Sequence, residues 1–172
     1  MTHDSIGVLD APHDSANRDG DFRWTDEFVL GYNEMDDVHR EFFDVVSQLL
    51  HSTDAAMLDA LDRFAAHARD HFGTEDRWMS ETDFPPRDCH IGEHAAVMES
   101  AAGVRERVSA GDYAIGRSFA RELVRWFPGH AQHLDSALAH WMFKRSYGGK
   151  PVVLRRNGIG VHSTVPRHSD HT

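Results

Sequence analysis

Five histidines and two carboxylates stand in or beside helical stripes where apolar side chains would be expected. Each lies three or four residues from apolar neighbours, the spacing that places side chains on one face of a helix. Burying one polar group without a partner costs about 1 to 3 kcal/mol, and a lone carboxylate costs more, so seven in one small core need a common partner. A shared cation would satisfy them all. The seven are His39, His71, Glu75, His90, His94, His130 and Asp135.

The spacing of these residues suits metal binding. His71 and Glu75 are four residues apart, as are His90 and His94, and residues four apart on a helix are separated by only about 40° around its axis. Five imidazoles and two carboxylates exceed the four ligands of a closed zinc site, whereas two metal ions that share bridging carboxylates would use every one. Mixed nitrogen and oxygen ligation favours iron or manganese over magnesium or calcium.

One pair does not fit an ideal helix. His130 and Asp135 are five residues apart, which separates them by about 140° and would direct them at different neighbours. A kink or restart of the helix at Pro128-Gly129 would bring them together, and a bridging carboxylate also lies at a different height from a terminal imidazole.

Four helical patterns must position these residues. They run from Asp36 to His51, through the stripe from Leu58 to Met79, from near Asp88 to around Gly111, and from Tyr113 to Trp141. Pro85-Pro86 must interrupt the chain between the second and third helices. Short connections make consecutive helices antiparallel, so we predict an all-α, up-down-up-down four-helix bundle.

The two ends of the chain differ from this middle region. We predict a disordered arm at residues 1–21, the bundle at 22–143, and a basic, mostly irregular tail at 144–172, which carries six basic residues and one acidic residue. The tail is a candidate for binding a protein partner, and the alternative is a solvated end.

Composition excludes several classes of protein. The 172 residues include a single cysteine, Cys89, so neither an internal disulfide nor a zinc site of several thiolates can form. We expect Cys89 to be a small, partly buried residue. The formal net charge of −10 disfavours a nucleic-acid surface. Because the chain shows neither a signal peptide nor a long apolar run, we predict a cytoplasmic protein without membrane insertion.

The chain from Trp24 to about Trp141 resembles the hemerythrin family, in particular the single-domain bacteriohemerythrins. The resemblance rests on Gly31–His39, on His71–Asp76, on Phe84-Pro85 followed by His90-x-x-x-His94, and on Trp126–His130 followed by Asp135. It implies a non-haem centre of two iron ions per chain, bridged by an oxo or hydroxo group and by Glu75 and Asp135. One iron would be capped by His90, His94 and His130. The other would be bound by His39 and His71 and would have an open position for dioxygen.

Trp126 and Phe127 are the candidate walls of an oxygen pocket, and ordinary core packing is the other interpretation of them. The sequence departs from the usual family pattern here, with Phe127 where leucine is common and Ala131 where isoleucine is common. Asp76 also replaces the usual second glutamate. These departures bear on oxygen affinity and access and leave the ligand set intact.

The resemblance implies reversible dioxygen binding, for storage, transport, delivery or sensing. The alternative on the same scaffold is a di-iron oxidase, a peroxidase or an enzyme that handles nitric oxide, since an open iron could turn dioxygen over. His90–His94 also matches the H-x-x-E-H pattern of some zinc peptidases, but that function would leave five of the seven polar residues without a purpose. Ferritin-like enzymes use Glu-x-x-His pairs, and this chain has none.

Overall fold

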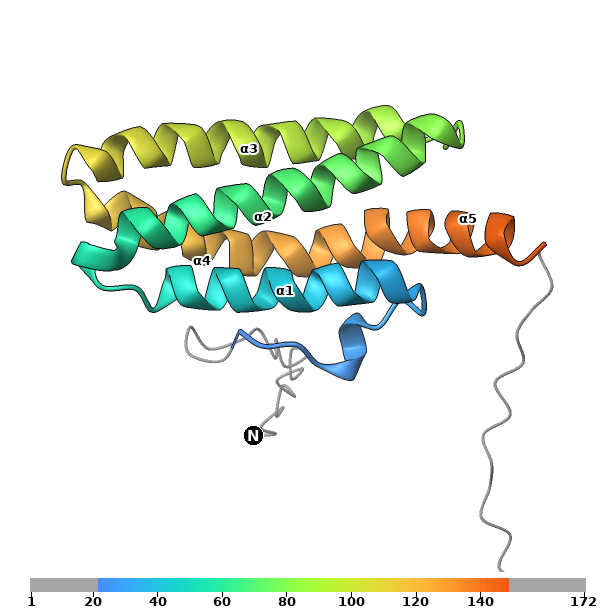
Figure 1. Ribbon diagram of the computed structural model, residues 1–172, viewed down its shortest axis with the longest axis horizontal. Coiled ribbons are helices and arrows are strands. Elements are labelled where there is room, and N and C mark those ends of the chain that lie inside the picture. Colours follow the sequence, from blue (N-terminus) through green and yellow to red (C-terminus); the bar gives the residue numbers. More distant parts are fainter. Residues whose placement is uncertain (1–21, 149–172) are drawn as a thin grey trace, which may run out of the picture.

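Four long helices run back and forth along one axis in the computed structural model, which describes residues 22–148 (Figure 1). They form the predicted all-α, up-down-up-down bundle. A short 3-10 helix, η1, precedes them, and a π-helical turn, η2, joins α4 to a final helix, α5. The elements are η1 (Asp26–Phe28), α1 (Asn33–Leu50), α2 (Asp54–Glu81), α3 (Arg87–Ser109), α4 (Tyr113–His130), η2 (Ala131–Asp135) and α5 (Ser136–Ser146).

The turns between helices follow local backbone chemistry. Asp83 adopts a positive φ of 51° two residues before Pro85, and Pro86 is the residue that precedes α3. Gly111 adopts a φ of 94°, which glycine tolerates best, and the side chain of the next residue, Asp112, accepts a hydrogen bond from the backbone N–H of Ile115. Both turns are short enough to keep consecutive helices antiparallel.

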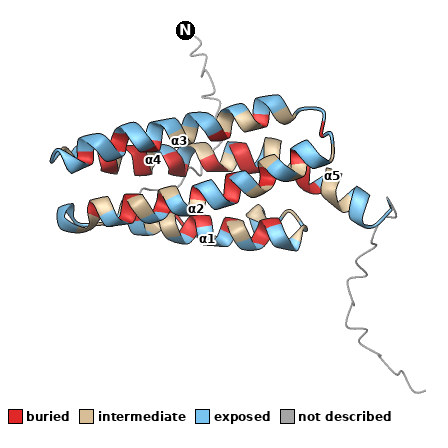
Figure 2. Cartoon of the chain, turned by 45° about the horizontal axis from the view of Figure 1, so that its top comes forward, coloured by how far each residue is buried: buried red, intermediate tan, exposed pale blue. Residues whose placement is uncertain are grey.

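The interior is divided along the bundle axis, with buried residues on the inward faces of all four helices (Figure 2). The half nearest the α1–α2 and α3–α4 turns is apolar and includes the fully buried Leu49, Leu61 and Phe64. Each such side chain contributes about 1.5 to 3 kcal/mol by leaving water. A smaller apolar cluster, with Met79 and Leu138, lies toward the α2–α3 turn. The seven polar residues occupy the layer between these clusters.

The segment before α1 packs against the bundle through aromatic rings. Phe22 stacks on Phe43 with ring centroids 4.2 Å apart, and Trp24 meets the same ring edge-on at 5.7 Å. The buried carboxylate of Asp36 accepts hydrogen bonds from the backbone N–H groups of Leu30 at 2.7 Å and Gly31 at 3.0 Å. Asp36 therefore ties this segment to the first turn of α1.

The arm predicted at residues 1–21 and most of the predicted tail lie outside the described residues. The part of the tail that is described, 144–148, continues α5 as far as Ser146. Within 22–148, no helix combines the length and apolar character needed to cross a membrane.

Candidate metal centre

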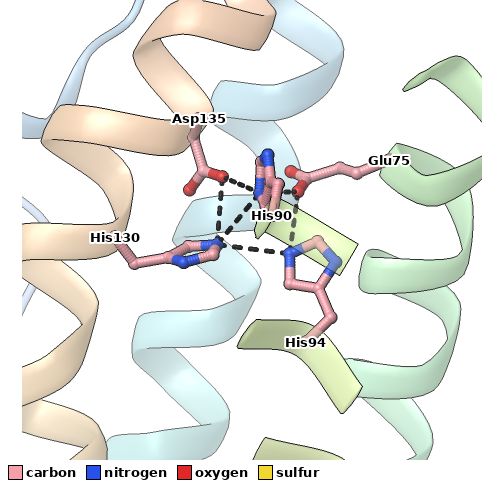
Figure 3. Close-up of side chains that lie close together, drawn as sticks. All are labelled: Glu75, His90, His94, His130 and Asp135. Carbon is pink, nitrogen blue, oxygen red and sulfur yellow. Dashed lines mark hydrogen bonds and ion pairs between the residues drawn. The ribbon is translucent and has the colours of Figure 1, made fainter. Parts of the chain in front are cut away.

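All seven predicted ligands are buried in one layer at the middle of the bundle. Their side chains come from four long helices and the π turn, and none of the seven residues is more than 4% exposed. Those in Figure 3 point toward one another from α2, α3, α4 and η2. Their ligand atoms form two groups that share Glu75.

The first group contains Glu75, His90, His94, His130 and Asp135, whose candidate ligand atoms all lie within 4.8 Å of one another. Nε2 of His130 is 3.2 Å from Nε2 of His90 and 3.2 Å from Nε2 of His94. Three imidazole nitrogens therefore converge on one point, with carboxylate oxygens beside them.

The second group contains His39, His71 and Glu75. Nε2 of His71 lies 3.1 Å from Oε1 of Glu75, and Nε2 of His39 lies 3.8 Å from the same oxygen. His39 is also 3.2 Å from Oδ2 of Asp135, so Asp135 reaches this group as well.

Both carboxylates divide their oxygens between the two groups. Glu75 presents Oε1 to His39 and His71, while its Oε2 lies 3.4 Å from Nε2 of His94. Asp135 presents Oδ2 to His39, while its Oδ1 lies 3.0 Å from Nε2 of His90. One oxygen toward each group is the arrangement that a carboxylate needs in order to bridge two cations.

The π turn resolves the five-residue spacing of His130 and Asp135. Helix α4 continues through Pro128 to His130, and a backbone bond from Ser136 N–H to the carbonyl of Ala131 closes the wider i→i+5 turn that follows. Widening the turn brings residues five apart toward the same face, and Oδ1 of Asp135 lies 3.2 Å from Nε2 of His130. A single π turn, rather than a restart of the helix at Pro128-Gly129, aligns the pair.

Several atoms of the layer have no hydrogen-bond partner. Within residues 22–148 these buried, unpartnered atoms include both ring nitrogens of His39, Oε2 of Glu75 and both carboxylate oxygens of Asp135. An unpaired buried polar atom is costly, and its cost is removed when a cation accepts its lone pair. The donor set therefore fits bound metal ions.

The electrostatics of the layer show how strongly these groups interact. Burial alone would lower the pKa of His39 and of His90, but the nearby carboxylates of Asp135 and Glu75 outweigh it and raise each pKa to about 9. Burial and the charge of Glu75 would raise the pKa of Asp135, but the surrounding imidazoles of His130, His39 and His90 hold that pKa far below its usual range. The two carboxylates therefore favour positive charge in this layer.

Two further carboxylates contact the layer from outside. Oδ1 of Asp76 lies 2.8 Å from Nδ1 of His94, and Oε2 of Glu93 lies 2.9 Å from Nδ1 of His130. Neither residue was predicted to contact the metal ligands, although each directly follows or precedes a predicted ligand. That adjacency was the only signal available in the sequence, because these contacts join residues 18 and 37 positions apart.

Trp126 and Phe127 contact different histidines of the layer. The buried ring of Phe127 meets the imidazole of His39 edge-on, with centroids 5.2 Å apart, and stacks on Phe42 at 4.4 Å. Trp126 packs over His130 at 4.2 Å. Of the two candidate pocket walls, Phe127 faces the group that has two imidazoles and Trp126 faces the group that has three.

The remaining histidines of the described chain and its cysteine lie outside the two groups of ligand atoms. His51, His133 and His140 are exposed and belong to neither group of ligand atoms. His67 is mostly buried beside His71, and burial together with the nearby His71 lowers its pKa to about 4. Cys89 is exposed, contrary to the partly buried position we expected, because it lies on the outward face of α3 next to the inward-facing His90.

Comparison with known proteins finds one family match that includes all seven predicted ligands. Residues 30–141 match the family described as "Hemerythrin HHE cation binding domain". A bacteriohemerythrin of Ralstonia nicotianae is 35% identical over 123 residues, which cover 72% of this chain and 90% of that protein. A myohemerythrin of Theromyzon tessulatum is 26% identical over 88 residues, or 51% of this chain and 72% of that protein.

Proposed function

Because the chain belongs to the hemerythrin family, we propose that it binds dioxygen reversibly at a non-haem centre of two iron ions. The family is one of di-iron proteins that bind dioxygen, and the buried histidine and carboxylate cluster suits a non-haem iron site. When bound, the two irons would together supply the two electrons that reversible dioxygen binding requires.

The observation that carries the proposal is the division of the carboxylate oxygens. Glu75 and Asp135 each present one oxygen to the three-histidine group and the other to the two-histidine group. A single metal ion would leave one oxygen of each carboxylate buried without a partner. Two ions, bridged also by an oxo or hydroxo group, would use all seven side chains.

The two groups differ in their number of imidazoles. His90, His94 and His130 would bind one iron together with the bridging carboxylates, whereas His39 and His71 would leave the second iron one nitrogen short. The smaller donor set supports the second position as the one where dioxygen would bind.

Apolar side chains protect the same position from water. Phe127 and Phe42 are at most 1% exposed and lie beside His39 and His71, with the ring of Phe42 6.0 Å from that of His71. Excluding water limits the proton-driven loss of reduced oxygen from such a site. We assign Phe127 as a wall of the oxygen pocket, while Trp126 supports the opposite group.

The test is anaerobic reduction of the iron-loaded protein followed by titration with oxygen. We expect two irons per chain and a visible spectrum that changes on oxygenation and returns when oxygen is removed. Zinc in place of iron, or a spectrum that oxygen does not alter, would contradict the proposal. Stoichiometric release of hydrogen peroxide would instead assign the chain to the di-iron oxidases. Storage, transport or sensing in the cytoplasm remain predictions from the sequence.

A ligand variant and a matched control sharpen this test. His71→Ala removes one of the two imidazoles beside the proposed oxygen position, so the oxygenated spectrum should be lost. His140→Ala removes an exposed imidazole of α5 that contacts the carbonyl of Ser136, and it should leave the spectrum unchanged.

A further inference from the structure

The outer edges of two of the five histidines are held by carboxylates. Nδ1 of His94 faces Asp76 across 2.8 Å, and Nδ1 of His130 faces Glu93 across 2.9 Å, while Nε2 of each ring points into the layer. Ionised carboxylates only accept hydrogen bonds, so each of these contacts requires the proton on Nδ1. The inward Nε2 of both rings is then left with its lone pair free for a metal ion.

The same two imidazoles are also held on their faces. Phe72 stacks on His94 with ring centroids 4.1 Å apart and planes 7° from parallel, and Trp126 lies over His130 at 4.2 Å. The indole N–H of Trp126 donates to Oε2 of Glu93 at 3.2 Å, the oxygen that also faces His130. Glu93 thus connects α3 to α4 through two side chains at once.

The histidines of the other group have no equivalent support. Within residues 22–148, Nδ1 of His39 and Nδ1 of His71 are buried without a hydrogen-bond partner. His67 packs against His71 with ring centroids 5.5 Å apart, but no hydrogen bond joins the two rings. Both outer carboxylates therefore act on one side of the layer.

We propose that Asp76 and Glu93 are positioning residues that make the three-histidine group the tighter of two unequal metal sites, an inference that rests on the proposed two-iron site. A carboxylate on the outer nitrogen fixes the tautomer and orientation of an imidazole ligand and raises its basicity. Because His94 and His130 both belong to the three-histidine group, these effects strengthen one site and leave the other, with His39 and His71, unassisted. The three-histidine group would then hold its iron more tightly, and the two-histidine group would leave room for a ligand.

The test measures iron retention by the full-length protein. Ferrous, iron-loaded samples are titrated anaerobically with a ferrous-iron chelator, and the iron equivalents left on the protein are counted. We expect the unmodified protein to release its two irons at different chelator concentrations. Asp76→Ala and Glu93→Ala should each weaken retention of the tighter iron by about 10- to 100-fold and leave the weaker iron within about threefold.

A graded series separates positioning from a merely structural role. Asp76→Asn and Glu93→Gln keep an acceptor oxygen but lose the charge, so their effects should lie between those of the unmodified protein and the alanine variants. Asp76→Glu and Glu93→Asp restore the carboxylate and should recover part of the retention. If an alanine variant fails to fold, these milder variants still test the inference by the same measurement of iron retention.

Exposed carboxylates on the same helices provide matched controls. Asp59→Asn on α2 and Glu99→Gln on α3 make the same chemical changes away from the layer and should leave both release steps unchanged. If variants of Asp76 and Glu93 release both irons as the unmodified protein does, or weaken the retention of both irons equally, this inference is overturned while the proposed function stands. An unmodified protein that binds fewer than two irons would overturn the proposed function itself.

Discussion

The apolar half of the bundle interior and the polar layer next to it are built from the same four helices but are stabilised in different ways. In the apolar half, side chains such as Leu61 and Phe64 are completely buried and pack against rings from the neighbouring helices, including Phe119 at 5.5 Å from Phe64. In the polar layer, buried nitrogen and oxygen atoms lack partners within residues 22–148. The apolar half is complete with protein atoms alone, whereas the donor set of the polar layer suits bound cations.

This difference separates folding from function. The apolar half supplies the burial that holds the helices together, so the polar layer can keep atoms whose hydrogen bonds are not satisfied. Buried carboxylates also differ among themselves, because within residues 22–148 both oxygens of Asp36 accept backbone hydrogen bonds, whereas neither oxygen of Asp135 has a hydrogen-bond partner. Changes in the two halves should therefore affect different measurements.

The largest expected effect is the loss of iron binding on removing a shared carboxylate. Glu75→Ala takes away an oxygen from both groups, so the protein should no longer hold two irons and its response to oxygen should disappear. Iron analysis and visible spectra measure this, and circular dichroism should show unchanged helix content, because the apolar half is intact. Glu81→Ala, at an exposed position of α2, is the matched control. Two irons retained in Glu75→Ala would show that this carboxylate is not a bridge.

The metal-free protein should lose stability as pH rises. The pKa values of His39 and His90 are raised from 6.5 to about 9 in the folded chain, so the folded state binds more protons than the unfolded state between these values. The contribution of these two histidines to the free energy of unfolding is fully present below about pH 6.5 and disappears as pH passes 9. The loss is on the order of several kcal/mol in total. Urea unfolding of the metal-free protein at a series of pH values measures it. A flat profile across this window would contradict the assignment.

In the apolar half, Phe64→Ala should lower the free energy of unfolding by about 3 to 5 kcal/mol, because it leaves a cavity where the ring meets Phe42 and Phe119. Iron content and the oxygen-dependent spectrum of the folded fraction should be retained. Thermal unfolding with parallel iron analysis measures both. Loss of iron in proportion to the loss of stability would show that the two halves are not separable.

A smaller effect is expected at Asp36, a buried carboxylate whose two oxygens both accept backbone hydrogen bonds. Asp36→Asn replaces one of two acceptor oxygens by an amide donor, so one backbone N–H of Leu30 or Gly31 loses its partner at a cost of about 1 to 3 kcal/mol. Unfolding in urea measures it, with and without iron. Asp37→Asn, which alters only an exposed ion pair with Arg40, should change stability by at most about 1 kcal/mol. An Asp36 variant that loses iron would place this residue among the metal-binding groups.

Much of the architecture follows from periodicity in the sequence. Apolar side chains at steps of three and four predicted four helices, and Pro85-Pro86 and Gly111 predicted two of the turns between them. The start of α1 at Asn33, three residues before the predicted start, was not expected, because the contacts that hold its first turn come from the preceding segment through Asp36. The exposed position of Cys89 likewise depends on which way one face of α3 is turned.

By itself, the sequence determined the helical class, the family, and the residues that share a helical face, such as His71 with Glu75 and His90 with His94. These are consequences of spacing within one element, where about 3.6 residues per turn decides direction. Only the tertiary structure decided how Glu75 and Asp135 divide their oxygens, how a π turn aligns Asp135 with His130, and which imidazoles Asp76 and Glu93 support. Such distances depend on how separate helices pack and on where the backbone departs from the regular helix, and neither is encoded in local periodicity.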